Sequence, residues 1–180
     1  MMKFEERTLD SKLEYCGKVL KVEKDIVSLS NGSKGFREII RHPGGVVILA
    51  MKDEDTILMV KQFRYAIKKT MLELPAGKLE PGENPDEACK RELKEETGYC
   101  AKNWKNLGYI YTTPGICDEK LHLYLATDLE FCGQTPDEDE IIEFSECKLY
   151  DIINLIMSGE ITDSKTICAI TRAFGFQSTT

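Results

Sequence analysis

The chain has 180 residues, a formal net charge of −7 and a hydrophobic fraction of 42%. This length fits one domain, or one domain with a small extension, and the charge argues against nucleic acid as a partner, because tracking its phosphates needs a basic face. The chain contains no apolar run long enough for a membrane span and no apolar segment typical of a signal peptide at its start, which predicts no membrane association. The dispersed cysteines contain no CxxC pair and predict reduced thiols in a cytoplasmic protein.

The first part of the chain mixes apolar and polar residues in a way that is typical of β-strands. Residues 16–30 predict an extended segment, Asn31-Gly32 predicts a turn after it, and residues 36–40 predict a second extended segment. The sequence therefore predicts a small N-terminal antiparallel β extension over residues 1–41 and a main domain over residues 42–180.

Two short apolar runs, 46–50 and 57–60, predict buried strands at the start of the main domain. A helix is expected next, because Asn84 suits an N-cap, Pro85 suits the first helical position, and acidic residues follow in the first turn. Gly98 supplies the signal that ends this helix.

The rest of the chain predicts further strands and helices. The strands are 107–111, 121–126 and 141–144, and the helices are 149–157 and 162–174. Strands and helices in this mixture predict an α+β domain with a mixed sheet between helices.

The helix after Asn84 carries a cluster of carboxylates. Glu92, Glu95 and Glu96 fall within an arc of about 100° on a helix, beside a stripe around Leu93 that can face the core. Like charges this close repel one another, and a hard divalent cation would turn that repulsion into coordination. Oxygen-only ligands suit Mg²⁺ or Mn²⁺. Taken alone, the same run is also compatible with a solvated helix face.

The surrounding segment, residues 77–99, reads GKLEPGENPDEACKRELKEETGY. It fits the pattern G-x5-E-x7-R-E-U-x-E-E-x-G-U at every fixed position and therefore resembles the Nudix box, the signature of the Nudix hydrolases. The resemblance implies an α/β/α sandwich with a mixed β-sheet. It also implies metal-dependent cleavage of a nucleoside diphosphate that is linked to another group.

The same resemblance implies roles for residues of the box and its surroundings. Glu92, Glu95 and Glu96 are expected to bind the metal, and Glu95 and Glu96 are counted among the catalytic residues. The carbonyl of Ala76 is expected to reach the metal, because a glycine follows it. Arg91 is expected to pair with a carboxylate of the box and to orient it.

A second segment, residues 111–120, reads YTTPGICDEK and places Pro114 sixteen residues after Gly98. It resembles the substrate loop of the ADP-ribose pyrophosphatase subgroup of the Nudix family. Pro114, Gly115 and Glu119 are therefore expected to bind substrate. A Pro-Gly pair is also typical of a plain turn between two strands.

Two upstream segments resemble the same subgroup. Arg64 ends a Gln-x-Arg motif, whose arginine holds a substrate phosphate in the subgroup, and its planar fork suits two phosphate oxygens. Glu38 belongs to a segment that resembles the subgroup's entry into the domain, and is expected to contact adenine or ribose. In that subgroup the N-terminal β extension packs across a dimer, which predicts a homodimer here.

An acidic run over residues 137–140 precedes the expected strand 141–144. Charge runs of this kind are usually solvated loops. In the ADP-ribose enzymes, however, an acidic loop at this place closes over the phosphates. By this resemblance Glu138 is the expected catalytic base, and Glu140 is a further metal ligand.

The resemblance predicts Mg²⁺-dependent hydrolysis of ADP-ribose to AMP and ribose 5-phosphate, with Mn²⁺ as the alternative cation. A Nudix hydrolase of another nucleotide sugar or of a dinucleotide is an alternative within the same reaction class. An alternative of another class is a sensor that binds ADP-ribose without cleaving it. The complete box, and the lack of a basic helix-turn-helix after it, argue against the sensor.

Overall fold

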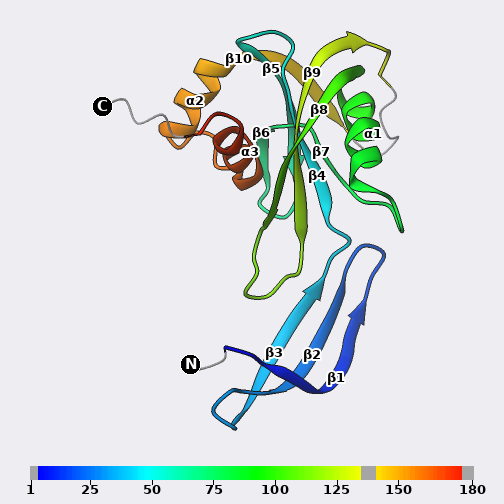
Figure 1. The fold of residues 1–180 in the computed structure, drawn as a ribbon, viewed down its shortest axis with the longest axis vertical. Helices are drawn as coiled ribbons and strands as arrows, with labels where there is room; N and C mark the ends of the chain where they lie inside the picture. Colours follow the sequence, from blue (N-terminus) through cyan, green and yellow to red (C-terminus); the bar gives the residue numbers. More distant parts are fainter. Residues whose placement is uncertain (1–3, 135–140, 176–180) are drawn as a thin grey trace. The chain divides into compact units, whose positions relative to one another are not determined.

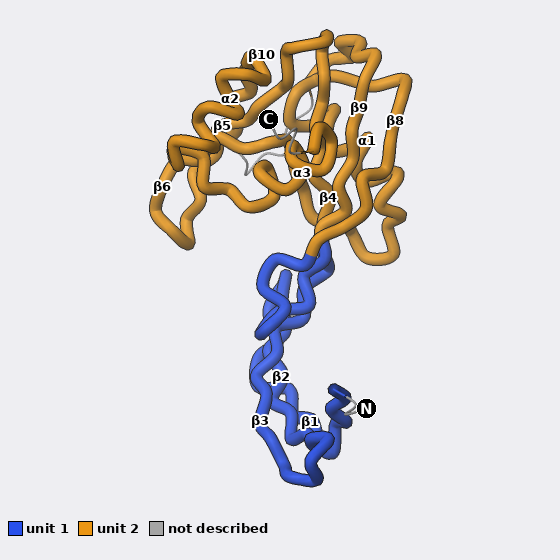
Figure 2. Tube along the Cα trace, turned by 60° about the vertical axis from the view of Figure 1, so that its left-hand side comes forward, with its two compact units in different colours: residues 1–44, 111–120 blue, residues 45–110, 121–180 orange. Residues whose placement is uncertain are grey.

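The computed structural model describes residues 4–134 and 141–175, and the chain divides into two compact units, coloured separately in Figure 2. Each unit takes its residues from two separate stretches of sequence. Unit 1 consists of Met1–Gly44 and Tyr111–Lys120, and unit 2 consists of Gly45–Ile110 and Leu121–Thr180.

Unit 1 is built on a three-stranded antiparallel sheet in the order β1-β2-β3. Its strands are β1 (Arg7–Cys16), β2 (Lys21–Ser28) and β3 (Lys34–Arg41). The turn between β2 and β3 is closed by Asn31, whose Oδ1 accepts from the Ser33 N–H at 3.0 Å. Every residue of β1 is exposed. The outer edge of this strand therefore faces solvent in the described chain.

Residues 111–120 join unit 1 through backbone hydrogen bonds to the end of β3. The Ile40 N–H donates to the Ile116 carbonyl at 2.7 Å, and the Asp118 N–H donates to the Ile40 carbonyl at 3.1 Å. The backbone N–H groups of Ile116 and Cys117 both donate to the Thr113 carbonyl, which closes a turn around Pro114-Gly115. The Pro-Gly pair thus forms a turn that is held against β3.

Unit 2 contains two sheets (Figure 1). The larger has the order β7-β4-β9-β8, in which β4 runs parallel to β9 and antiparallel to β7, so the sheet is mixed. The smaller is antiparallel in the order β10-β5-β6. The strands are β4 (Gly45–Ala50), β5 (Thr56–Arg64), β6 (Lys69–Glu73), β7 (Ala76–Lys78), β8 (Tyr99–Tyr111), β9 (Lys120–Phe131) and β10 (Ile142–Lys148).

Strand β4 separates two hydrophobic cores, because successive side chains of a strand point to opposite faces. Val47 and Leu49 belong to one core, which packs against helices α2 and α3. Val46 and Ile48 belong to the other core, which packs against α1. The helices are α1 (Pro85–Thr97), α2 (Leu149–Met157) and α3 (Ser164–Phe174), and Figure 1 shows α1 on the opposite side of the sheet from α2 and α3. The predicted α+β class, with a mixed sheet between helices, is confirmed.

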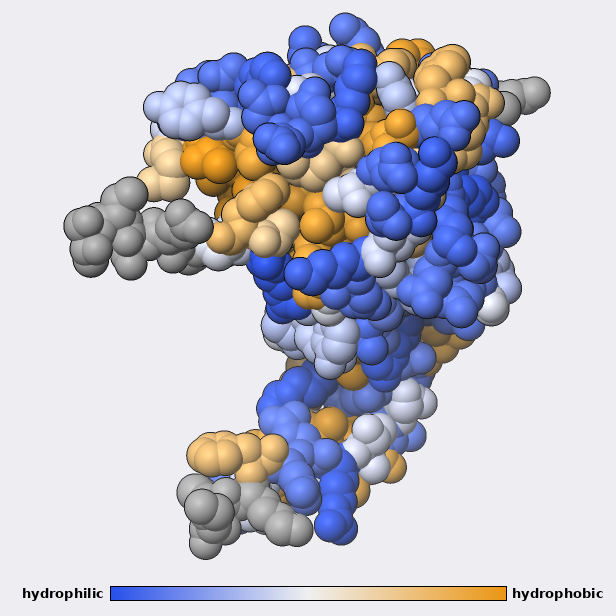
Figure 3. All heavy atoms as spheres, turned by 45° about the horizontal axis from the view of Figure 1, so that its top comes forward, coloured by the Kyte–Doolittle hydropathy of each residue, from blue (hydrophilic) through white to orange (hydrophobic). Residues whose placement is uncertain are grey.

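The strand predicted at residues 107–111 is longer in the structure, because β8 begins at Tyr99. Strands β6 and β7 were not predicted, and both are short. In the drawn view, hydrophilic residues cover most of the surface and hydrophobic residues form smaller areas between them (Figure 3). None of the helices in the described part of the chain is both long and apolar enough to cross a membrane.

Candidate active site

Helix α1 is fixed at both ends by its own sequence. The Asn84 side chain accepts from the Asp86 N–H at 3.0 Å, Pro85 starts the helix, and Gly98 ends it in the left-handed conformation with φ 78°. These are the predicted cap residues. The helix buries Cys89 and Leu93 against the core, so the positions beside this stripe lie at the edge of a packed face.

Two carboxylates lie at that edge. Glu92 is 8% exposed and Glu96 is 4% exposed. The Ala76 N–H donates to Oε2 of Glu96 at 3.0 Å, which connects strand β7 to the helix. A Cβ atom at Gly77 would lie 1.8 Å from the carboxyl carbon of Glu92. A glycine at this position is therefore a steric requirement of the contact between strand β7 and the helix.

Arg91 orients the carboxylates of the box. Its Nη1 donates to Glu92 Oε1 and to Glu95 Oε2, both at 2.8 Å, and its Nε donates to Glu83 Oε1 at 2.8 Å. The hydrogen bond with Glu83 is the main reason that the pKa of Arg91 is raised, and the same bond lowers the pKa of Glu83. A single guanidinium therefore fixes three carboxylates, as a partner that orients metal ligands does.

The donor set of this edge suits a hard divalent cation. Its side-chain donors are carboxylate oxygens, two of which are buried, and a backbone approaches them closely at Gly77. Within the described ranges, no three His, Cys, Asp or Glu side chains form a complete cation site. Mg²⁺ typically uses one or two carboxylates, with substrate phosphates and water completing its shell. The residues present therefore fit such a cation.

Arg64 lies at the end of β5 and is held by a buried carboxylate. Its Nε donates to Glu73 Oε1 at 2.9 Å and its Nη2 donates to Glu73 Oε2 at 2.5 Å. The pKa of Arg64 is raised, mainly by this hydrogen bond to Glu73. The structure gathers Arg64, Ala76, Glu92, Glu95 and Glu96 in unit 2.

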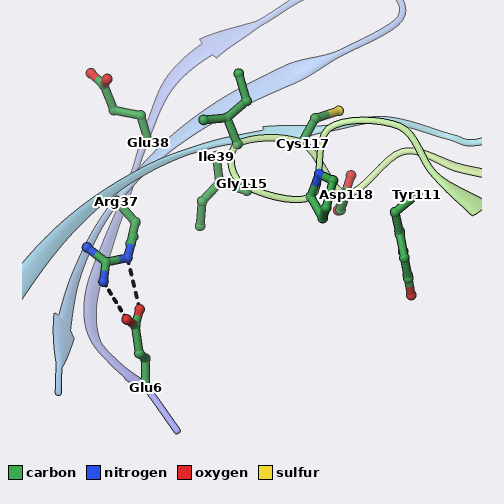
Figure 4. Close-up of a pocket in the computed structure, with 10 residues that line it drawn as sticks. Glu6, Arg37, Glu38, Ile39, Tyr111, Gly115, Cys117 and Asp118 are labelled. Carbon is green, nitrogen blue, oxygen red and sulfur yellow. Dashed lines mark hydrogen bonds and ion pairs between the residues drawn. The ribbon is translucent and has the colours of Figure 1, made fainter. Parts of the chain in front are cut away.

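A second group of expected site residues lies in unit 1. Glu38, Pro114 and Gly115 line an open hollow of about 440 Å³, together with Arg37 and Asp118 among others. Figure 4 shows Arg37 and Glu6 facing one another, with Glu38 pointing away from them. Arg37 Nε donates to Glu6 Oε2 at 2.9 Å.

Glu119 lies in the same unit and accepts from the Thr112 hydroxyl at 2.7 Å. Its Oε1 is 3.3 Å from Nδ1 of His42. These contacts fix the position of the Glu119 side chain next to the Pro114 turn. The structure therefore brings all the predicted binding residues of the 111–120 loop, together with Glu38, into unit 1.

Some site residues were missed, and others fall outside the described chain. Glu73 is the main omission, because a lone acid at the end of a short strand carries no recognisable spacing. The structure reveals Glu73 by its burial, because the residue is 1% exposed and contacts both Arg64 and Lys165. Glu138 and Glu140 lie outside the described residues, so their roles stay predictions.

Comparison with known proteins places this geometry in a family. The NUDIX domain family matches residues 41–169. An "ADP-ribose pyrophosphatase" of Bacillus subtilis (strain 168) is 44% identical over 94% of this chain and 93% of that protein. A "Methanol dehydrogenase activator" of Bacillus methanolicus is 41% identical over 93% of this chain and 91% of that protein. A solved structure titled "Crystal structure of ADP compounds hydrolase" has a similar fold, with a TM-score of 0.82 at 21% identity, over 94% of this chain and 92% of that one.

The fold and the complete carboxylate box are those of a metal-dependent pyrophosphohydrolase. The chain belongs to the Nudix family, and the predicted family, fold and enzyme class are confirmed.

Proposed function

We propose that this enzyme hydrolyses ADP-ribose to AMP and ribose 5-phosphate with Mg²⁺ as its cation. The observation that carries the proposal is the edge of α1, where the buried carboxylates Glu92 and Glu96 meet the backbone of strand β7. Carboxylates placed to hold a divalent cation, and an arginine in the same unit that can bind phosphate, suit a substrate with adjacent phosphates. The name of the Bacillus subtilis relative supports ADP-ribose as that substrate.

The metal would be held by Glu92 and Glu96, with Glu95, the Ala76 carbonyl and Glu140 as further ligands. When bound, the cation would neutralise charge that develops on the phosphates. Arg91 contributes by holding Glu92 and Glu95 through the hydrogen bonds from its Nη1. The shared donor holds the two carboxylates close to one another.

The reaction needs a base and a water molecule. Glu138 would take a proton from water, whose oxygen attacks one phosphorus in line while the bond from that phosphorus to the bridging oxygen breaks. Arg64 would hold an oxygen of one phosphate, which orients the pyrophosphate for attack. The two products then carry one phosphate each, as AMP and ribose 5-phosphate do.

By the resemblance to the ADP-ribose pyrophosphatase subgroup, Glu38, Pro114, Gly115 and Glu119 are the proposed contacts for the nucleoside or ribose part of the substrate. Glu38 supplies an acceptor for amino or hydroxyl groups, and Pro114-Gly115 supply a turn whose glycine leaves open space. Glu119 is a second acceptor, which its contacts with Thr112 and His42 hold in place.

We further propose that residues 1–41 serve dimerisation and that residues 42–180 form the catalytic domain of a cytoplasmic homodimer. The support is strand β1, which is exposed along its whole length. Its outer edge has no strand partner among the described residues. Exposed edge strands of this length are unusual in monomers, because they pair readily with other chains.

The decisive experiment is a product assay with ADP-ribose, ADP-glucose, GDP-mannose, NADH, diadenosine polyphosphates and dNTPs, each with Mg²⁺, Mn²⁺ or EDTA. We expect metal-dependent AMP and ribose 5-phosphate from ADP-ribose, well above the other products. Glu96→Gln should lower kcat by about 100-fold or more, because it removes a ligand charge. Faster cleavage of another compound would make that compound, and not ADP-ribose, the proposed substrate. Binding of ADP-ribose without any cleavage would support a sensor instead.

A second candidate function is activation of a methanol dehydrogenase, because the Bacillus methanolicus relative is named a methanol dehydrogenase activator. The test adds wild type or Glu96→Gln to a methanol dehydrogenase assay. Stimulation by wild type alone would link activation to the hydrolase site. No stimulation by either protein would exclude this function for the dehydrogenase tested.

A further inference from the structure

The most unusual charged group in unit 2 that the proposed reaction does not use is Glu73. It ends strand β6 and is 1% exposed, yet it is paired with cations from two different elements. Arg64 contacts it from β5, and Lys165 contacts it from the first turn of α3. Burying an ionised carboxylate costs free energy even when it is paired, so this arrangement calls for an explanation beyond packing.

The geometry of the Arg64 contact suggests what Glu73 does. A guanidinium carries five N–H donors on Nε, Nη1 and Nη2. Glu73 occupies the edge formed by Nε and Nη2, at 2.9 Å and 2.5 Å. In the described residues, Nη1 donates to no protein acceptor. Glu73 therefore fixes the plane of the guanidinium and leaves its outer end, in a side chain that is 37% exposed, for another anion.

The carboxylate is itself held from the far side. Lys165 contacts Glu73 and also lies 2.9 Å from Asp163, the N-cap residue of α3. The Thr166 hydroxyl accepts from the Leu74 N–H at 2.9 Å and donates to Asp163 at 2.6 Å. The first turn of α3 thus fixes the side chain of Glu73 and the backbone that follows it.

This strand end leads directly to the box. The Pro75 carbonyl accepts from the Ile48 N–H at 2.8 Å, and the Ala76 N–H donates to Glu96 at 3.0 Å. A chain of contacts therefore runs from α3 through Glu73 to Arg64, and through residues 74–76 to the box helix.

We propose that Glu73 is a positioning residue, which acts through Arg64 and aims the free end of the guanidinium at a substrate phosphate. This role rests on the proposed function, in which Arg64 binds that phosphate. Lys165 is the counter-cation that keeps Glu73 ionised and in place, and it does not itself contact substrate.

The test is a double-mutant cycle with wild type, Arg64→Ala, Glu73→Gln and the double variant, in which kcat and KM are measured separately. We expect Glu73→Gln to raise KM and lower kcat/KM by about 10- to 100-fold, the size seen when partners behind a binding group are removed. In the Arg64→Ala background the same change should cost less than about 2-fold, because the residue through which Glu73 acts is gone.

Two further variants separate positioning from folding. Glu146→Gln is the matched control, because it makes the same change in an exposed carboxylate that pairs with Lys52 and has no role in the site, so its KM should stay within about 3-fold of wild type. The double variant Glu73→Gln/Lys165→Met removes one charge of each sign. It should keep the raised KM of Glu73→Gln, and its melting temperature should be closer to that of wild type than that of Glu73→Gln is. A wild-type KM for Glu73→Gln would overturn the proposal. So would an equal loss in both Arg64 backgrounds, which is the signature of a purely structural role.

The cycle is run on the compound of the panel that the wild type cleaves fastest. If the wild type cleaves another compound but not ADP-ribose, ADP-ribose is rejected as the substrate, and the cycle on the other compound still tests the role of Glu73. If nothing is cleaved, the same four proteins are compared for ADP-ribose affinity by calorimetry. An Arg64→Ala variant with wild-type KM would reject the phosphate role of Arg64 and, with it, the role of Glu73.

Discussion

At the scale of single residues, the site requires a glycine at position 77, because a side chain there would overlap Glu92. An added Cβ would lie within 1.8–2.1 Å of the atoms of the Glu92 carboxyl group, a distance that real side chains do not show. The alanine variant must therefore push strand β7 away from the helix or displace the carboxylate. Either movement would spoil the geometry that Arg91 and Ala76 impose on the box.

We expect Gly77→Ala to lower kcat/KM for ADP-ribose by about 100-fold, a loss typical of displaced metal ligands or their supports. Lys78→Ala is the matched control, because it changes the next residue of the same strand and adds no atom beside Glu92. Steady-state kinetics over a range of Mg²⁺ concentrations measure the effect. Normal kinetics for Gly77→Ala would show that Glu92 need not occupy its observed position.

A second prediction at this scale concerns pH and Glu73. Burial opposes its ionisation, but hydrogen bonds and charge from Arg64 and Lys165 outweigh burial and lower its pKa. A carboxylate with a lowered folded pKa stabilises the fold above its unfolded pKa of about 4.3, and this contribution is lost as the pH falls through the lower folded value. Asp163 and Glu96 are the other acids near this cluster.

We therefore expect Glu73→Gln to be less stable than wild type at pH 7 by about 3 kcal/mol, as when one partner of a buried ion pair is removed. The difference should begin to shrink as the pH falls below the unfolded pKa of about 4.3, and it is lost as the pH falls through the lowered folded pKa. Chemical denaturation between pH 3 and pH 8 measures both values. A difference that stays constant across this range would mean that the charge of Glu73 does not stabilise the fold.

At the scale of elements, α1 has one face in the core and one edge in the site. Cys89 lies on the core face and is 1% exposed. Burial, and to a smaller extent the charge of Asp86, raise the pKa of its thiol to about 12. Cys16 and Cys132, by contrast, are exposed. All seven cysteines of the chain are described and are free thiols.

Because the thiolate is the reactive form, we expect Cys89 to be the slowest cysteine to alkylate in the native protein at pH 8. Mass spectrometry of peptides after timed treatment with iodoacetamide gives the order of modification. Cys16 and Cys132 serve as internal references for exposed thiols. Rapid labelling of Cys89 would show that α1 opens from the core far more readily than its packing implies.

At the scale of the whole molecule, the exposed strand β1 is the feature that calls for a partner. Leu9, Leu13 and Tyr15 are each more than half exposed on this strand. We expect the wild type to be a dimer by light scattering coupled to size exclusion. Leu13→Lys should shift it toward monomer, because a lysine on an edge strand disfavours pairing. Ser33→Lys, which adds the same charge in the β2–β3 turn, should stay dimeric. A monomeric wild type would reject the dimer outright.

Local patterns in the sequence predicted the reaction class and most of the elements. Asn84, Pro85 and Gly98 set the ends of α1 through local hydrogen bonds and backbone preference, which are written in neighbouring residues. The continuous apolar run over 46–50 predicted a strand buried on both faces, and β4 is buried along its whole length. The box spacing identified the family without any contact being known. The site residues were proposed from the resemblance, and the domain boundaries from the pattern of extended segments and turns.

Tertiary structure alone decided which distant residues act together. Glu73 is joined to Arg64 nine positions away and to Lys165 ninety-two positions away, and no local pattern encodes such pairs. The short strands β6 and β7 lack enough residues to show a period, so pairing with β5 and β4 defines them. The 111–120 turn joins unit 1 through hydrogen bonds to β3. Local preference fixes where an element starts and ends, whereas burial and pairing across the chain fix which side chains meet.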